Sequence, residues 1–244
     1  MTIEIVEIIG RSEQGITKPF ICRGDDGQVY FVKGRGAGRR SLICEWVAGQ
    51  LGRRLGLPIA HFEIVQVPQE LLSIAMRDDL VELGAGKAFG SRKVPVVELT
   101  ASHLDDVPGE VQRDVLAFDW WVRNGDRSLG ETGGNPNLFW DMENQDLMVI
   151  DHNQAFDPDF SPRDFACLHA FHVECPVLFG DRVLQQMYVK RFLGALADWE
   201  TICHTVPPEW WFLDAEQTVP TNFDVRATYQ LLIQCQTDGF WSLE

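Results

Sequence analysis

Residues 117–156 read AFDWWVRNGDRSLGETGGNPNLFWDMENQDLMVIDHNQAF, and this stretch decides how the rest of the chain is interpreted. Two short apolar runs, LFW and LMVI, are joined by a polar turn, a pattern that predicts a β-hairpin. Asn137 precedes the first run and Asp151 follows the second, so an antiparallel hairpin would make them neighbours. Asp126 lies on the glycine-containing loop just before the hairpin, and we expect it to lie close to both.

These three side chains match the needs of phosphoryl transfer. Mg²⁺ takes oxygen ligands and usually keeps only one or two from the protein, which an amide and a carboxylate can supply. In that chemistry Asp126 would accept or orient the attacking hydroxyl, and Asn137 and Asp151 would hold the metal on the phosphates. Each of the three is, by itself, also typical of an ordinary turn.

The N-terminal half offers a second constellation. The run YFVKG predicts a strand that ends at Lys33, and Glu45 falls in a helix predicted over residues 41–55. Ser41 is the expected N-cap of that helix, and Gly56 its end. A strand lysine held by a helix glutamate orients an ammonium group onto nucleotide phosphates. The bland alternative for this pair is a solvated lysine at a strand end.

The polar loop at residues 10–18 is a candidate phosphate cover. Its residues Gly15 and Thr17 would let backbone N–H groups approach phosphates. Neither a Walker-type loop nor a dinucleotide-binding fingerprint occurs in the chain, so an ordinary surface loop is an equal alternative.

Composition narrows the class of protein. The 244 residues carry 21 basic and 36 acidic side chains, a net charge of −15, which argues against a general nucleic-acid binder. No apolar run approaches the roughly 20 residues of a membrane span, and the N-terminus does not read as a signal peptide. Six scattered cysteines predict reduced thiols and a cytoplasmic location.

The remaining pattern predicts an α+β protein, with a small mixed β-rich part at residues 1–100 and a mainly helical part at 101–244. Strands are expected at 3–9, 20–22, 29–32 and 61–67, and helices at 68–79, 110–123, 163–172, 181–204 and 223–240. The residues Cys167, His169, His172 and Cys175 could ligate zinc, but their spacing and apolar surroundings favour a core helix. The C-terminal tryptophans fit a core or a partner surface.

The motifs, in this order along the chain, resemble those of the HipA-like kinases, relatives of the phosphatidylinositol-kinase branch of the protein-kinase-like fold. The matching segments are VYFVKG around Lys33, EWVAGQLGRRLGLP at 45–58, FGS at 89–91, NGDR at 124–127, NPNLFW at 135–140 and VIDHNQAF at 149–156. The resemblance implies a bilobed kinase-like fold with ATP and Mg²⁺ as cofactors. It also implies Lys33 on the phosphates, Asp126 as catalytic acid/base, and Asn137 with Asp151 as metal ligands.

The chain departs from the family pattern between Asp126 and Asn137. These residues are 137 − 126 = 11 positions apart, more than is usual in the family, because SLGETGG is inserted. Asn135 is therefore a rival metal ligand, although Asn137, directly before the apolar strand, matches the motif better. The insertion leaves open a pseudokinase that binds nucleotide and acts as an interaction protein. A further alternative is a scaffold that binds no ATP.

For an active kinase, the expected acceptor is a hydroxyl group, with a protein Ser or Thr favoured. The chain's own Ser12 or Thr17 is one option, and a small molecule is another. The expected partners are thus ATP and a hydroxyl acceptor, with neither a membrane nor nucleic acid.

Overall fold

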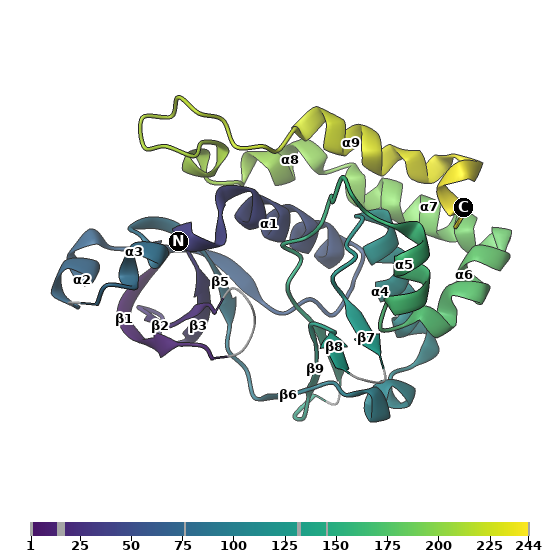
Figure 1. Ribbon diagram of the computed structural model, residues 1–244, viewed down its shortest axis with the longest axis horizontal. Coiled ribbons are helices and arrows are strands. Elements are labelled where there is room, and N and C mark those ends of the chain that lie inside the picture. Colours follow the sequence, from purple (N-terminus) through teal and green to yellow (C-terminus); the bar gives the residue numbers. More distant parts are fainter. Residues whose placement is uncertain (1, 14–17, 76, 131–132, 145, 244) are drawn as a thin grey trace. The chain divides into compact units, whose positions relative to one another are not determined.

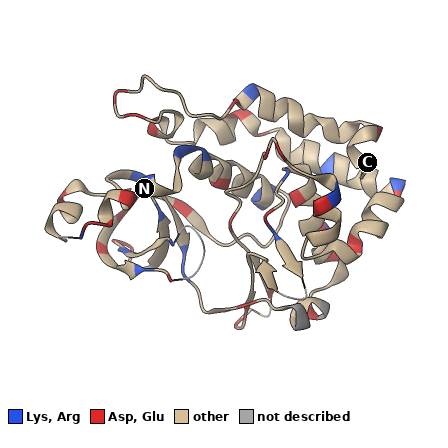
Figure 2. Ribbon diagram, viewed as in Figure 1, with Lys and Arg blue, Asp and Glu red and all other residues tan. Residues whose placement is uncertain are grey.

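The computed structural model describes residues 2–13, 18–75, 77–130, 133–144 and 146–243, and their mixed α+β structure confirms the predicted class. They fall into two compact units, each built from separate stretches of sequence (Figure 1). The barrel unit comprises Met1–Trp46, Ala60–Val94 and Pro207–Asn222, and the helical unit comprises Val47–Ile59, Pro95–Val206 and Phe223–Glu244. The bilobed arrangement and the lobes of residues 1–100 and 101–244 stay predictions. Acidic residues occur throughout both units (Figure 2).

The barrel unit is organised around a closed barrel with strand order β1-β2-β3-β5-β4. A parallel pairing of β1 with β4 closes it, and the other neighbours are antiparallel. β1 continues through Arg11, where a loop was predicted, because its last residues still pair with β2. The strands are β1 (Ile3–Arg11), β2 (Phe20–Gly24), β3 (Val29–Lys33), β4 (Phe62–Val67) and β5 (Gly86–Arg92).

One face of each strand fills the barrel, as the alternation of buried and half-buried residues in β2 and β3 shows. The short helices α2 (Gln69–Ile74) and α3 (Leu80–Leu83) add apolar side chains to this core. The predicted single helix at 68–79 is wrong. Arg77 bonds Asp79 two positions along, and side chains at that spacing do not face each other on a helix.

Helix α1 (Arg39–Arg54) follows the 3₁₀ turn η1 (Arg35–Ala37) and spans the boundary between the units after Trp46. It begins two residues before Ser41, so the predicted N-cap is wrong. Its end is as predicted: Gly56 has φ +78, and the Leu57 N–H bonds the Gly52 carbonyl.

The C-terminal segment Pro207–Asn222 belongs to the barrel unit and contacts β5 through Trp210 and Glu209. Trp210, in η4 (Pro208–Trp211), is fully buried, and its indole N–H donates to the Lys87 carbonyl of β5 at 3.0 Å. Thr221 in turn donates to the Trp210 carbonyl. Trp210 is thus a core residue, one of the two roles that the sequence left open.

The helical unit contains two small sheets. The first has strand order β10-β9-β6 and the second pairs β7 with β8. The strands are β6 (Val96–Glu98), β7 (Ser128–Gly130), β8 (Gly133–Asn135), β9 (Leu138–Asp141) and β10 (Asp146–Val149). The helices are α4 (Gly109–Trp121), α5 (Pro162–Leu168), α6 (Cys175–Gly180), α7 (Arg182–Leu196), α8 (Trp199–His204) and α9 (Val225–Ile233), with 3₁₀ turns η2 (Ala101–Asp106), η3 (His172–Glu174), η5 (Gln234–Gln236) and η6 (Asp238–Trp241).

Trp121 of α4 anchors this helical packing. Its ring stacks on Phe192 of α7 at 4.4 Å between centroids, and its indole N–H donates to the Leu232 carbonyl of α9. The helix predicted at 181–204 is in fact two helices, and the break falls at Asp198, whose carboxylate pairs with Arg54. Helix α4 ends at Trp121 and therefore delivers the chain directly to the loop that carries Asp126.

Candidate active site

Lys33 and Glu45 form the predicted ion pair within the barrel unit. Lys33 is the last residue of β3 and Glu45 lies on α1, and the Lys33 Nζ is 2.8 Å from a Glu45 carboxylate oxygen. Their side chains are only 12% and 4% exposed. A pair this sheltered is held in one geometry, so the solvated-lysine alternative does not describe it.

Lys33 borders a depression that is lined by both basic and acidic side chains. Arg11 lies there too, stacked over the Phe20 ring at 4.8 Å and bonded to Glu82. The adjacent Gly34 packs so tightly that an added Cβ would lie 2.0 Å from the Leu83 carbonyl oxygen. The lining residues are Arg11, Lys18, Pro19, Phe20, Val32, Lys33, Gly34, Ala37 and Glu82. The candidate phosphate-covering residues Gly15 and Thr17 lie outside the described residues.

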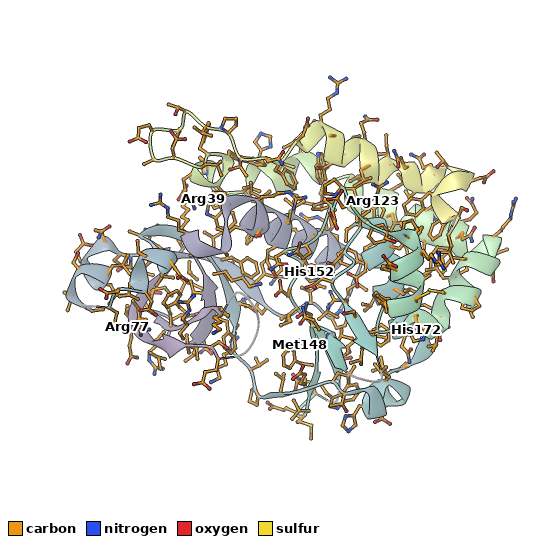
Figure 3. All side chains as sticks on the ribbon, in the orientation of Figure 1. Arg39, Arg77, Arg123, Met148, His152 and His172 are labelled. Carbon is orange, nitrogen blue, oxygen red and sulfur yellow. The ribbon has the colours of Figure 1, made fainter. Side chains whose placement is uncertain are left out.

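In the helical unit, β9 and β10 form the predicted hairpin. Leu138 pairs with Val149 in the antiparallel register, and the Ile150 N–H donates to the Asn137 carbonyl at 3.1 Å. Asn137 and Asp151 therefore leave the same end of the hairpin, as predicted. In Figure 3 the labels on Met148 and His152 mark the segment that contains Asp151.

Asp126 lies within hydrogen-bonding distance of both candidate asparagines. Its Oδ2 accepts from the Asn135 amide at 2.9 Å and from the Asn137 amide at 3.2 Å. Partial burial raises the pKa of Asp126, and the nearby Asp151 charge raises it further, against the lowering effect of Arg127 and the two amides. The result is a carboxyl group that is a stronger proton acceptor than an exposed aspartate.

The insertion between Asp126 and Asn137 folds into the short hairpin β7–β8 rather than a loop. Ser128 pairs with Asn135, and Asn135 in turn donates to Asp126. Gly134 makes this pairing possible, because an added Cβ would lie 2.3 Å from the Ser128 carbonyl oxygen. The β7–β8 pair was not predicted from the sequence, because its strands are three residues long and contain several glycines.

The backbone at both candidate metal ligands adopts the left-handed conformation, with φ +50 at Asn137 and φ +56 at Asp151. Asn and Asp tolerate this region better than most residues, but it still costs about 1–3 kcal/mol for each. Strained backbone of this kind is typical of functional sites. Some other interaction must hold the two residues in place.

A buried network beneath the site supplies that interaction, and the sequence did not predict it. Arg127 is completely buried, and its Nε donates to the Asp119 carboxylate at 2.6 Å. Its Nη1 lies 2.9 Å from the Asn137 carbonyl oxygen and 3.2 Å from those of Pro136 and Ile150. The only signal in the sequence was Asp119 itself, a lone acid within the apolar run VLAFDWWV.

Asp119 is held from three sides. Besides Arg127 it accepts hydrogen bonds from Asn124 at 2.8 Å and contacts the His169 Nε2 at 3.1 Å. Burial alone would raise the pKa of Asp119, but Arg127 and His169 outweigh it and hold the pKa below its usual range. Asp119 therefore keeps its negative charge and balances the buried Arg127.

The sequence of the chain shows the family to which it belongs. The model of the HipA-like kinase family matches residues 5–244. The chain belongs to the HipA-like kinase family. Among solved structures, a match to the crystal structure of a Helicobacter pylori proinflammatory kinase, CtkA, has a TM-score of 0.49 at 10% identity and covers 98% of this chain and 95% of that one. A match to the open conformation of CtTel1 has a TM-score of 0.31 at 13% identity, over 94% of this chain and 12% of that one. No curated protein sequence matches the chain.

For a kinase of this family, the donor set at Asn137 and Asp151 fits a hard divalent cation. Within the described ranges no three His, Cys, Asp or Glu side chains converge as a metal cage would require. Mg²⁺ bound with phosphates needs no such cage, because one or two protein oxygens suffice. The Asn137 side chain bonds Asp126 through its amide nitrogen, so the amide oxygen of Asn137 does not take part in that hydrogen bond.

The Cys/His segment has a different role from a zinc site. Helix α5 ends at Leu168, so His169 and His172 do not share the predicted helix face. The His169 Nδ1 accepts the Phe171 N–H at 3.0 Å, which leaves its Nε2 to donate to Asp119. Burial lowers the pKa of His169, in keeping with a neutral ring. His169 thus belongs to the buried network of this kinase.

Among the described helices, none is long and apolar enough to cross a membrane.

Proposed function

We propose that this kinase uses ATP and Mg²⁺ and transfers the γ-phosphoryl group of ATP to a hydroxyl acceptor, of which a protein Ser or Thr is the favoured class. The observation that carries the proposal is the cluster of Asp126, Asn137 and Asp151, assembled despite the insertion. Family membership supports the transfer of a phosphoryl group. The six free cysteines support the proposed cytoplasmic location.

Each residue has a distinct task in the proposed reaction. The Lys33 ammonium, held by Glu45, would neutralise nucleotide phosphates. Asn137 and Asp151 would hold Mg²⁺, which supplies charge compensation on the phosphates when bound. Asp126 would take the proton of the acceptor hydroxyl. At the same time the hydroxyl oxygen would form a bond to the γ-phosphorus, and the bond between that phosphorus and the ADP oxygen would break. Asn135 and Asn137 would keep the Asp126 carboxylate aimed at that proton.

The test is single-turnover phosphoryl transfer by an Asp126→Asn variant, assayed with ATP, Mg²⁺ and mixed Ser/Thr peptides and, in parallel, for self-modification. A general base contributes about 10²–10⁴-fold, so we expect a rate loss of this size with ATP binding kept. Asp159→Asn, at an exposed aspartate on the following loop, is the matched control and should transfer normally.

A fully active Asp126→Asn variant would overturn the catalytic assignment. If the wild-type chain binds ATP but transfers to no acceptor, including itself, the pseudokinase alternative replaces this proposal. The β7–β8 hairpin weighs against that alternative, because it returns Asn135 and Asn137 to hydrogen-bonding distance of Asp126.

A further inference from the structure

We propose that Arg127 is a positioning residue that sets the spacing of the Asn137 and Asp151 metal ligands; this inference rests on the proposed function. Arg127 directly follows Asp126, yet its side chain points away from solvent and is completely buried. Its guanidinium bonds main-chain carbonyls and the Asp119 carboxylate. It would therefore act through the backbone that carries the two ligands.

The contacts of Arg127 join the two chain segments that form the metal site. Its Nη1 bonds the carbonyl of Asn137, at the entrance of β9, and that of Ile150, at the exit of β10. The second of these carbonyls immediately precedes Asp151. One planar cation thus ties together the two points from which the ligands project. The two hydrogens on Nη1 are shared among these acceptors and Pro136.

Holding these points matters because both ligands adopt left-handed backbone. At this end the Ile150 N–H donates to the Asn137 carbonyl, and the β9–β10 ladder ends at the pair Leu138 and Val149. Without Arg127 the Asn137 and Ile150 carbonyls would lose a buried charged donor. The strained backbone would then relax, and the spacing of the ligands would widen.

Asp119, which pairs with Arg127, is itself held by several hydrogen bonds. Asp119 lies on helix α4 and accepts a hydrogen bond from the Nε of Arg127. His169 and Asn124 also form hydrogen bonds with the Asp119 carboxylate. The tautomer of His169 is fixed by the Phe171 N–H, so its Nε2 can only donate. Asp119 and Arg127 therefore connect helix α4 to the backbone that carries the proposed metal ligands.

A lysine cannot replace this arginine. Lysine would keep the positive charge, but its single ammonium lacks the planar fork that reaches both a carboxylate and several carbonyls. Substitutions of residues that orient metal ligands typically reduce metal affinity 10–100-fold. A residue with only a structural role would lower the melting temperature and leave the metal dependence unchanged.

The experiment measures the thermal stabilisation of the full chain by ATP across a Mg²⁺ titration, for wild type, Arg127→Lys and the control Arg163→Lys, which changes an exposed arginine of α5. We expect Arg127→Lys to raise the half-saturating Mg²⁺ concentration at least tenfold. Stabilisation by ATP in a metal chelator should stay within twofold of wild type. Arg163→Lys should match wild type in both.

An unchanged half-saturating Mg²⁺ concentration in Arg127→Lys would overturn the inference while leaving the proposed function intact. If wild type shows no Mg²⁺-dependent stabilisation, the proposed function and the role of Arg127 both fail. Should Arg127→Lys not fold, His169→Gln is the milder variant, since glutamine can still donate to Asp119 but lacks the rigid ring that the Phe171 N–H holds in one orientation. It should raise the half-saturating Mg²⁺ concentration a few-fold, and no change would overturn the inference.

Discussion

The two clusters of candidate site residues, one in each unit, differ in the contacts that support them. In the barrel unit, Lys33 meets Glu45 in one ion pair at a strand end. In the helical unit, Asp126, Asn137 and Asp151 rest on a second layer made by Asp119, Arg127 and His169. The first arrangement holds one lysine side chain, whereas the second includes two proposed metal ligands with left-handed backbone.

The difference also appears in solvent access. The Lys33 side chain borders a depression and keeps 12% of its surface exposed. Arg127 and Asp119 are both 0% exposed, and neither can be compensated by water. A change in the buried layer should therefore cost more stability than the same change in the Lys33–Glu45 pair.

The largest expected effect comes from matched carboxylate-to-amide changes. Asp119→Asn leaves the buried charge of Arg127 unpaired and should cost about 3–5 kcal/mol of unfolding free energy. Glu45→Gln should cost about 1–3 kcal/mol, because Lys33 can still meet water. Urea unfolding of both variants measures the two losses of unfolding free energy. Equal losses would show that the buried layer is no more sensitive than the Lys33–Glu45 pair.

An intermediate effect is expected from the inserted hairpin. Gly134→Ala forces a Cβ against the Ser128 backbone and should displace Asn135, lowering the transfer rate roughly tenfold without changing ATP affinity. Gly130→Ala is the control, since its Cβ would meet only an ordinary contact at 3.7 Å. Equal rates in the two variants would show that the hairpin does not position the site.

The smallest expected effect is a shift in pH dependence. The hydrogen bond that the Asn135 side-chain amide donates to Asp126 stabilises the ionised carboxylate and so lowers the pKa of Asp126. Asn135→Ala removes that bond, the pKa rises, and the acidic limb of the pH profile of kcat/KM should move to higher pH. A limb that stays in place or moves to lower pH would contradict the proposed role of Asn135.

Much of the site could be predicted from short-range patterns. The strand before Lys33, the helix around Glu45 and the hairpin that joins Asn137 to Asp151 all follow from hydrophobic periodicity and turn residues. Hairpin geometry then brings the two ligands together, because the ends of antiparallel strands meet. These predictions needed no knowledge of contacts far apart in sequence.

The buried layer could not be predicted in the same way. Asp119 and His169 are 50 positions apart and meet only after the helical unit has folded. His169 was assigned to a helix face, but the fold ends α5 one residue earlier and turns the ring towards Asp119. The split of the helix at 181–204 likewise was not predicted from the sequence.

The measurement that most directly tests the central claim is a thermal-unfolding titration with ATP, with and without Mg²⁺, on wild type and Asp151→Asn. A ligand at a hundred times its dissociation constant adds about 2.7 kcal/mol to the unfolding free energy, which shifts the midpoint measurably. We predict a Mg²⁺-dependent shift in wild type that is lost in Asp151→Asn. A wild-type chain that shows no shift with ATP under either condition would contradict the account and favour the scaffold alternative.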